Sequence, residues 1–541
     1  MPKIQLILFV IGCHTLTACV SQSAPTPPPL AMTRNQNGLE ESKALGYLGE
    51  QYEKAERYED ALTKTRQAIF KAQEPHALAW LIRWQWQLGR IFKAQGKMNQ
   101  AIAAYQQAQQ NLVPEKTFRW KMTGCQVPGK PSLYKKLRPL FFQLADMFLQ
   151  RATIENEPTK KQEDLRQARN TIEQLKRADV EQYFGDCVTA FHNKSKGLDD
   201  IIDAHTAVIY PILLNDRLEL LVRFLDEFAT IQRFQVPVGI VQIRDEVAQF
   251  REQLEAGYDD RESTQFKAHA QQLYAWLIKP LHPLLTQHAI NTLVFVPEGP
   301  LLTFPIAALH DGEQFLIENF AVAITPGLSL TDPKSGTLTA SHTPVLFGAI
   351  TKATQDYSEL PYAQSEIEAL GRLYQNATLL QDERFTLAEL TKALDNQYYS
   401  LVHLISHAEF SDHLEQSFIL TFDGKLTLEQ LKSLIQPTKR RQTPIELLTL
   451  SACNTAEGDN EWAALGLSGI ALKAGARSTL ATLWKAHDKT TYLLITRFYR
   501  ALITEKLSKA RALQAAQIQI IDSIYHHPFY WAPLILIGNW M

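Results

Sequence analysis

A regular alternation of short apolar runs and amphipathic segments over the second half of the chain constrains the fold most. From residue 343 onward, runs such as "PVLFGAI", "SLVHLISH", "IELLTLSAC" and "RSTLATLW" are separated by stretches with helical periodicity. Short runs that are apolar at nearly every position are typical of strands covered on both faces. The alternation therefore predicts a mostly parallel sheet flanked by helices in residues 343–541.

The preceding segment, residues 187–342, is predicted to contain strands and helices in a less regular order. In "TAVIYPILLNDRLELLVRF" two β-branched apolar runs flank the turn dipeptide Asn215-Asp216, which predicts a β-hairpin. Two helical stretches follow, at 238–256 and 263–286, and then short strands punctuated by Pro and Gly. We assign this segment to a separate part of the chain that precedes the parallel sheet.

Residues 41–186 read as helices with an internal repeat. Small residues at fixed spacing let the two helices of a hairpin approach closely, while larger ones fill the groove between neighbours. Five positions recur 40 residues later, so that Leu48, Gly49, Tyr52, Ala61 and Ala68 are matched by Leu88, Gly89, Phe92, Ala101 and Ala108. A third unit carries Leu144, Ala145, Phe148, Ala168, Ile172 and Leu175. The pattern resembles tetratricopeptide repeats, and a generic helical bundle is the alternative.

The amino terminus has the pattern of an export signal. Lys3 precedes an apolar run, Ile4 to Gly12, that is too short to span a bilayer. The tetrapeptide ending at Cys19 resembles a bacterial lipobox, which implies removal of residues 1–18 and lipidation of Cys19. Residues 19–40, rich in Ser and Pro at their start, are expected to form a flexible tether.

The expected location is therefore the bacterial cell envelope, where the exported chain is held by a lipid. Val20 and not an aspartate follows the cysteine, which favours the outer membrane in a Gram-negative cell. An ordinary secretory signal, with Cys19 incidental, is the alternative.

Charge and cysteine content limit the classes of partner. The formal net charge is −2, so no global field favours nucleic acid or an anionic membrane. No metal-ligand cluster and no Gly-rich phosphate loop has a recognisable spacing, so no metal or cofactor is expected. Once Cys13 leaves with the signal and Cys19 is acylated, Cys125 and Cys187 are left as a possible disulfide pair in an oxidising compartment. Cys453 is then the odd thiol, which in an exported protein marks a candidate reactive group.

Two strand ends carry the candidate chemistry. In "IELLTLSACNTAEG", Ile445 to Leu450 reads as a buried strand, and Cys453 follows at the carboxyl end, where open α/β sheets bind ligands. In "YYSLVHLISHAEF", Leu401 to Ile405 reads as a second buried strand, with His407 at its end. Adjacent parallel strands would present this nucleophile and base along one edge. His403 is expected to be a hydrogen-bonded core histidine, and a buried cysteine acting as a small hydrophobe is the alternative for Cys453.

From about residue 165 to 541 the chain resembles the CHAT domain, a caspase- and separase-related peptidase domain of clan CD often found behind tetratricopeptide repeats. The resemblance is carried by "VHLISHAEF", "LLTLSACNTAEGDNEWAALGLSGIALKAGARSTLATLWKAHDKTT" and "HPFYWAPLILIG". The earlier segment "LVFVPEGPLLTFPIAALHDGEQFLIENFAVAITPG" resembles the first part of that domain. The resemblance implies an N-terminal helical array followed by a caspase-like α/β domain, and cysteine endopeptidase activity.

The resemblance also implies roles for single residues. His407 and Cys453 match the catalytic dyad, and the backbone N–H groups of Ala408 and Cys453 are the candidates for the oxyanion hole. Relatives often have glycine where this chain has Ala408, which keeps the N–H but restricts φ. Asp488 matches an acidic position that lines the pocket for the residue before the scissile bond. Its alternative role is to cap a helix that begins at Lys489.

These observations predict a membrane-tethered cysteine endopeptidase whose access is controlled by a protein partner bound to the helical repeats. The expected partners are a protein or peptide substrate and that repeat-bound protein, with no nucleic acid and with a membrane only through the lipid. A non-catalytic scaffold is the alternative from another class, and a thiol acyltransferase is a third. Trp484 and the aromatic residues of "FYWAP" are expected in the core or in a pocket wall.

Overall fold

The computed structural model describes residues 37–73, 77–112, 133–184, 202–225, 230–332, 338–339, 343–374, 376–410, 417–435, 444–451, 454–455, 476–484 and 486–541. Among these residues, no helix combines the length and the apolar character needed to cross a membrane. Cys19, Cys125, Cys187 and Cys453 all lie outside the described residues, as do the predicted signal and most of the predicted tether.

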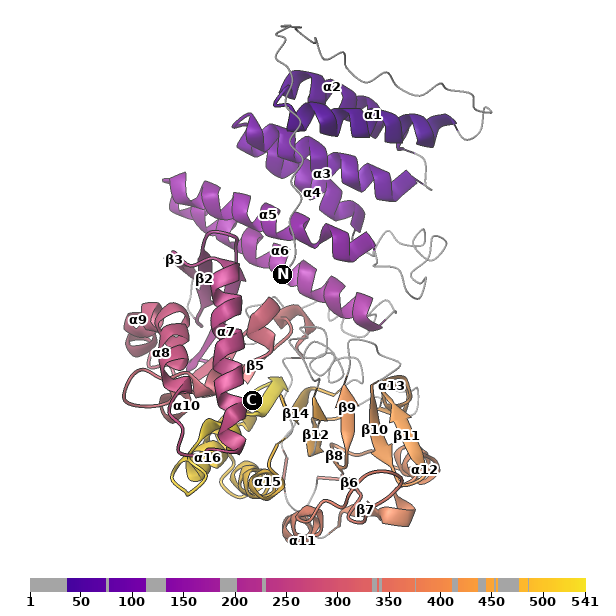
Figure 1. Cartoon of the computed structure of the whole chain (residues 1–541), viewed down its shortest axis with the longest axis vertical. Coiled ribbons are helices and arrows are strands. Elements are labelled where there is room, and N and C mark those ends of the chain that lie inside the picture. Colours follow the sequence, from indigo (N-terminus) through magenta and orange to yellow (C-terminus); the bar gives the residue numbers. More distant parts are fainter. Residues whose placement is uncertain are drawn as a thin grey trace, which may run out of the picture.

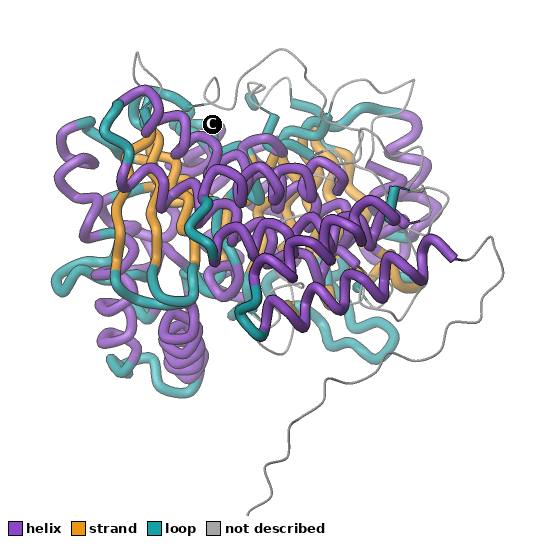
Figure 2. Tube along the Cα trace, turned by 90° about the horizontal axis from the view of Figure 1, so that it is seen from above, coloured by secondary structure: helices purple, strands orange, loops and turns teal. Residues whose placement is uncertain are grey.

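An array of helical hairpins forms the first part of the described chain, as the sequence predicts (Figure 1). In Figure 2, seen from above, its helices run side by side over the rest of the molecule. The helices are α1 (Asn37–Lys54), α2 (Tyr58–Lys71), α3 (Leu78–Ala94), α4 (Met98–Leu112), α5 (Leu133–Ile154) and α6 (Pro158–Phe184).

The repeated small residues account for the close packing within each hairpin. A Cβ atom on Gly49 would lie 2.6 Å from the Thr65 hydroxyl, and one on Gly89 would lie 2.2 Å from the ring of Tyr105. The alanines of the repeat are fully buried as well: Ala61, Ala68, Ala101 and Ala108. The spacing found in the sequence therefore marks the contact line between paired helices.

One eleven-stranded sheet spans the rest of the chain, in the order β3-β2-β1-β4-β5-β15-β14-β12-β8-β6-β7. Seven of the ten neighbouring pairs are parallel in the described residues, so the predicted mostly parallel sheet is confirmed. Its strands are β1 (Thr206–Leu213), β2 (Leu218–Arg223), β3 (Ile231–Val236), β4 (Thr292–Phe295), β5 (Ala321–Ile324), β6 (Val345–Ala349), β7 (Thr378–Gln381), β8 (Leu401–Ile405), β12 (Leu447–Ser451), β14 (Ser478–Thr482) and β15 (Leu534–Gly538).

The C-terminal strand β15 lies in the middle of this sheet. It pairs antiparallel with β14 and parallel with β5, where Ile537 faces Ile324. Strands from 187–342 and from 343–541 therefore belong to one continuous sheet. The predicted hairpin around Asn215-Asp216 is confirmed, because β1 and β2 pair antiparallel on either side of it.

Helices flank the sheet. They are α7 (Ile240–Glu255), α8 (Phe266–Leu277), α9 (His282–Gln287), α10 (Leu316–Asn319), α11 (Ala363–Leu373), α12 (Leu387–Asn396), α13 (Leu428–Ile435), α15 (Asp488–Ile503) and α16 (Lys509–Ile521). The helix expected over 263–286 is interrupted after Leu277, because Pro280 and Pro283 lack the N–H that a continuous helix needs. Residues 463–474, in which the helical periodicity of the second half of the chain predicts a further helix, lie outside the described residues.

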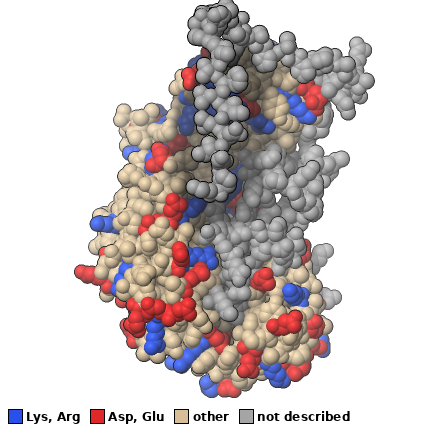
Figure 3. Space-filling model, in the orientation of Figure 1, with Lys and Arg blue, Asp and Glu red and all other residues tan. Residues whose placement is uncertain are grey.

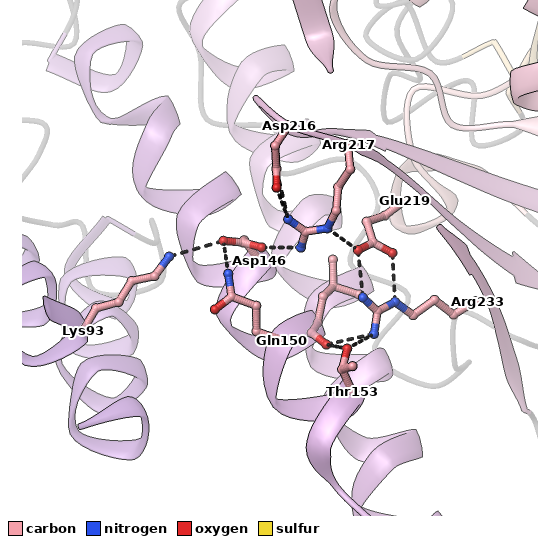
Figure 4. Close-up of polar contacts among 9 residues, drawn as sticks. Lys93, Asp146, Gln150, Thr153, Asp216, Arg217, Glu219 and Arg233 are labelled. Atoms are coloured by element: carbon pink, nitrogen blue, oxygen red, sulfur yellow. Dashed lines mark hydrogen bonds and ion pairs between the residues drawn. The ribbon is translucent and has the colours of Figure 1, made fainter. Parts of the chain in front are cut away.

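Partly buried ion pairs connect the helical array to the edge of the sheet (Figure 4). The carboxylate of Asp146 in α5 accepts hydrogen bonds from Arg217 at 2.6 Å and from Lys93 of α3 at 3.2 Å. Arg217 also donates to Glu219 of β2 at 2.7 Å, and Arg233 of β3 donates to both oxygens of Glu219. A chain of alternating charges thus runs from α3 through α5 to the sheet.

The last helix of the array, α6, lies against the chain on either side of β5. The buried carboxylate of Glu173 accepts hydrogen bonds from the Tyr210 hydroxyl at 2.7 Å and from the N–H of Leu328 at 2.9 Å. Lys176 is equally buried and pairs with Glu298 at 2.5 Å. The face of the molecule drawn in Figure 3 shows acidic and basic side chains interspersed over the described surface, in keeping with a net charge near zero.

Candidate active site

Strands β8 and β12, which precede His407 and Cys453 in sequence, are neighbours in the sheet. They run parallel over five residue pairs, from Leu447 beside Leu401 to Ser451 beside Ile405. The N–H of Ser406 donates to the carbonyl of Ser451 at 3.1 Å, which extends the pairing beyond the ends of the strands. The predicted adjacency and direction of the two strands are confirmed.

A small second sheet continues from these strand ends. It has the order β11-β10-β9-β13, built from β9 (Ala408–Phe410), β10 (Phe418–Thr421), β11 (Gly424–Thr427) and β13 (Asn454–Thr455). Strand β13 pairs parallel with β9, so that Asn454 faces Glu409. The two chain segments are therefore side by side both before and after the position of His407.

His407 is partly exposed and is oriented by a backbone carbonyl. Its Nε2 lies 2.8 Å from the carbonyl oxygen of Ser358, and its ring lies 5.1 Å from that of Tyr357. Because a carbonyl only accepts hydrogen bonds, Nε2 carries a proton, and Nδ1 is the basic nitrogen of the neutral ring. The side chain is thus held in the tautomer that leaves Nδ1 available to take up a proton.

Ala408 directs its backbone N–H away from β10. The N–H of Leu420 donates to the carbonyl of His407 at 2.8 Å, and Ala408 occupies the following pair, opposite Ile419. Successive residues of a strand point their N–H groups to opposite sides. The Ala408 N–H therefore points to the side of β9 on which β13 lies.

Asp488 is the first residue of α15 and lies within electrostatic range of His407. Burial raises the pKa of Asp488 above its ordinary range, and the nearby carboxylate of Glu366 raises it further. The N–H of Tyr362 and the charges of His487 and His407 act in the opposite direction.

The alternative role of Asp488, as the cap of a helix beginning at Lys489, is wrong. The helix begins at Asp488 itself, and its N-cap residue is His487, which accepts a hydrogen bond from the N–H of Thr490. The carboxylate of Asp488 accepts instead from the N–H of Tyr362 at 2.8 Å, immediately before α11. Asp488 thus joins the starts of α11 and α15.

His403 is a core residue, as the sequence predicts. Its ring is fully buried, with Nε2 2.9 Å from Glu366 and Nδ1 3.1 Å from the Tyr499 hydroxyl. The aromatic residues assigned to the core or a pocket wall are buried as well: Trp484, Phe529, Tyr530 and Trp531.

Sequence reasoning missed two groups of this region. The Ser358 carbonyl left no signal, because any residue supplies a backbone carbonyl. Glu366 did leave one, since it occupies the same helical face as Ala363, Ile367 and Leu370, which are buried. Within the described part of the chain, no group of three or more His, Cys, Asp or Glu side chains could hold a metal ion.

Comparison with known proteins identifies one family. The family model described as "CHAT domain" matches residues 267–539. No curated protein matches the sequence. Among solved structures, the crystal structure of a de novo designed helical repeat protein aligns with 47% of this chain and 98% of its own, at 13% identity and a TM-score of 0.20. That score is too low to support any statement about the fold or function of this chain.

Proposed function

This chain belongs to the CHAT-domain family, and from that premise we propose that it is a cysteine endopeptidase in which His407 and Cys453 form the catalytic dyad. The family is related to caspase-like cysteine peptidases. The observation that carries the proposal is the parallel pairing of β8 with β12. His407 lies directly beyond the end of β8, and the Ser358 carbonyl orients its ring.

The chemistry follows from the unprotonated nitrogen of His407, Nδ1. Nδ1 takes the thiol proton of Cys453, and the resulting thiolate attacks the peptide carbonyl carbon to form a C–S bond. The imidazolium then gives its proton to the leaving amine as the C–N bond breaks. Water, deprotonated by the same nitrogen, cleaves the thioester and restores the thiol. The N–H groups of Ala408 and Cys453 would bind the oxyanion of each tetrahedral intermediate.

The test is cleavage of a proteome-derived peptide library by the soluble chain lacking residues 1–30, under reducing conditions, read by mass spectrometry. The Cys453→Ala and His407→Ala variants are the matched controls. The proposal predicts cuts that disappear in both variants. Cuts that persist in Cys453→Ala would refute it.

Asp488 is proposed to favour a basic residue before the scissile bond. Its half-buried position near His407 and its carboxylate support this role. Lys or Arg should then precede most cuts, and Asp488→Asn should remove that preference while leaving the dyad intact. The exposed Asp395 in α12 provides a control substitution, Asp395→Asn.

Access to the site is proposed to depend on a protein bound to the helical array. Two sets of contacts support coupling. One is the partly buried ion-pair chain between α5 and β2–β3, and the other is the set of hydrogen bonds of the buried Glu173 to the segment after β5. Glu173→Gln should speed hydrogen exchange at residues 328–331 and change the cleavage rate. Unchanged exchange and cleavage would argue against such coupling.

The membrane tether is proposed to be a lipid on Cys19. The lipobox-like sequence supports it, and labelling of the full chain with a fatty acid in a bacterial host tests it. Label that is lost in Cys19→Ala is the expected result, and label that persists would refute the assignment.

The second candidate is a non-catalytic scaffold, which the extensive helical array favours. The scaffold would keep its cellular function in Cys453→Ala, and the peptidase would lose it.

A further inference from the structure

A buried carboxylate connects the two strands that lead to the proposed dyad. Glu366 extends from α11 to the main sheet, where one carboxylate oxygen lies 2.9 Å from Nε2 of His403 in β8. The other oxygen accepts a hydrogen bond from the Ser451 hydroxyl in β12 at 3.2 Å. All three side chains are at least 97% buried. Glu366 therefore links β8 and β12 through side chains, in addition to their backbone pairing.

A second helix, α15, also contributes a side chain that contacts both β8 and β12. The hydroxyl of Tyr499 in α15 lies 3.1 Å from Nδ1 of His403 and 2.7 Å from the Thr449 hydroxyl. Thr449 and His403 face each other in the register of β12 and β8. Each of the two helices α11 and α15 thus inserts one polar side chain that touches both strands.

The protons of this network have a self-consistent arrangement when His403 is neutral. A carboxylate only accepts, so Nε2 of His403 and the Ser451 hydroxyl both donate to Glu366. Nδ1 of His403 then accepts from Tyr499, and Tyr499 accepts from Thr449. Every one of these polar groups has a partner.

The position of the network, and not its contribution to stability, points to a role for Glu366. Replacing buried charged groups by well-packed apolar residues is often neutral or stabilising, so the fold alone does not require a carboxylate between two strands. Ser451 is the last residue of β12 and stands two positions before Cys453. His403 stands four positions before His407.

We propose that Glu366 is a positioning residue, which fixes the end of β12 against β8 through Ser451 and His403 and so sets the relation between Cys453 and His407. This inference rests on the proposed function, because the relation matters only if the two residues react together. Glu366 does not itself contact a substrate in this proposal.

The test compares Glu366→Ala, Glu366→Gln and Ser451→Ala with the matched control Ser478→Ala, which removes a buried hydroxyl of the neighbouring strand β14 that donates to the Asn539 carbonyl and lies outside this network. Two rates are measured on each soluble chain lacking residues 1–30: alkylation of Cys453 by iodoacetamide, read by mass spectrometry, and cleavage of a library-derived peptide. Circular dichroism and the melting temperature identify variants that fail to fold.

Ser451→Ala should lower kcat about tenfold, the effect of losing one hydrogen bond to a charged group, with little change in KM. Glu366→Ala loses the hydrogen bonds from both His403 and Ser451 and should lower kcat at least as much. Cys453 alkylation should fall with kcat. Glu366→Gln should recover part of both rates, because its amide oxygen still accepts from His403. The double variant Glu366→Ala/Ser451→Ala should be no slower than Glu366→Ala, and Ser478→Ala should stay within about twofold of wild type.

Independent effects of Glu366→Ala and Ser451→Ala, or unchanged alkylation of Cys453 in both, would overturn the positioning role. Alkylation that responds to Glu366 and Ser451 in a chain without peptidase activity would uphold the positioning role and reject the proposed function. The two hypotheses therefore fail on different measurements.

Discussion

Glu219→Ala is expected to destabilise the contact between the helical array and the sheet by about 3 kcal/mol. The Glu219 side chain is fully buried, and its carboxylate accepts three hydrogen bonds from Arg217 and Arg233 at 2.7–2.8 Å. In the variant Arg217 keeps Asp146, whereas the partners that Arg233 keeps among the described residues are neutral, the Leu149 carbonyl and the Thr153 hydroxyl. Removing one partner of a buried pair costs about 3–5 kcal/mol, and we take the lower end because both guanidiniums are partly exposed.

The assay is urea unfolding of the soluble chain, followed by tryptophan fluorescence and by calorimetry. Asp216→Ala is the matched control, since Asp216 pairs with the same Arg217 but is 72% exposed. That control should change the free energy of unfolding by about 0.5 kcal/mol or less. The reasoning fails if Glu219→Ala destabilises the protein by less than 1 kcal/mol, or no more than Asp216→Ala does.

Four further predictions each concern a single residue. Gly538→Ala should destabilise the protein by about 2 kcal/mol or more, because Gly538 has a φ of +95° and a Cβ would lie 2.4 Å from the Arg477 carbonyl oxygen. Gly371→Ala in α11, where a Cβ would have no described atom within 4 Å, should instead stabilise the protein by up to about 1 kcal/mol. Denaturant unfolding measures the change in both variants. Burial lowers the pKa of His527 in the folded protein to about 4, so the unfolded state binds more protons than the folded state at mildly acidic pH. About 3 kcal/mol of stability should therefore be lost as the pH falls from about 6.5 to about 4. His527→Asn, which can still accept from the Phe529 N–H, should flatten that dependence. The raised pKa of Asp488 has the opposite effect on stability, because here the folded state binds more protons than the unfolded state. Wild type should therefore lose stability relative to Asp488→Asn as the pH rises from about 4. Parallel curves of stability against pH for the two proteins would refute the shift.

The sequence predicted the elements whose signal is local. Strand β8 coincides with the predicted run from Leu401 to Ile405, because five consecutive apolar or packed positions fit a strand covered on both sides. The hairpin around Asn215-Asp216 carries its own turn residues. The repeat spacing of Gly49 and Gly89 reflects close contact between the two helices of one hairpin. This contact is local, so it does not depend on how the hairpins are arranged in space.

Elements that depend on distant partners were not predictable in this way. The central place of β15, between β5 and β14, depends on pairing between residues more than 200 positions apart, as between Ile537 and Ile324. The charges of α6 also look like ordinary surface residues in the sequence. Lys176 is buried beside Glu298, which lies far along the chain and supplies the opposite charge, and it also donates to the Pro297 carbonyl.

The polar network beneath the candidate site shows that misfits in a pattern can be informative together. His403 interrupts the apolar strand "LVHLI", and Glu366 occupies the buried face of a helix whose exposed face carries Glu368. Taken alone, each is a polar residue in an apolar position, and such residues need a partner to be buried. Two such polar residues in one domain can be partners of each other. His403 and Glu366 are partners in this way, with Nε2 of His403 2.9 Å from a carboxylate oxygen of Glu366. A buried carboxylate predicted from helical periodicity therefore has its first candidate partner in the histidine that breaks the pattern of a neighbouring strand, before any coordinates are known.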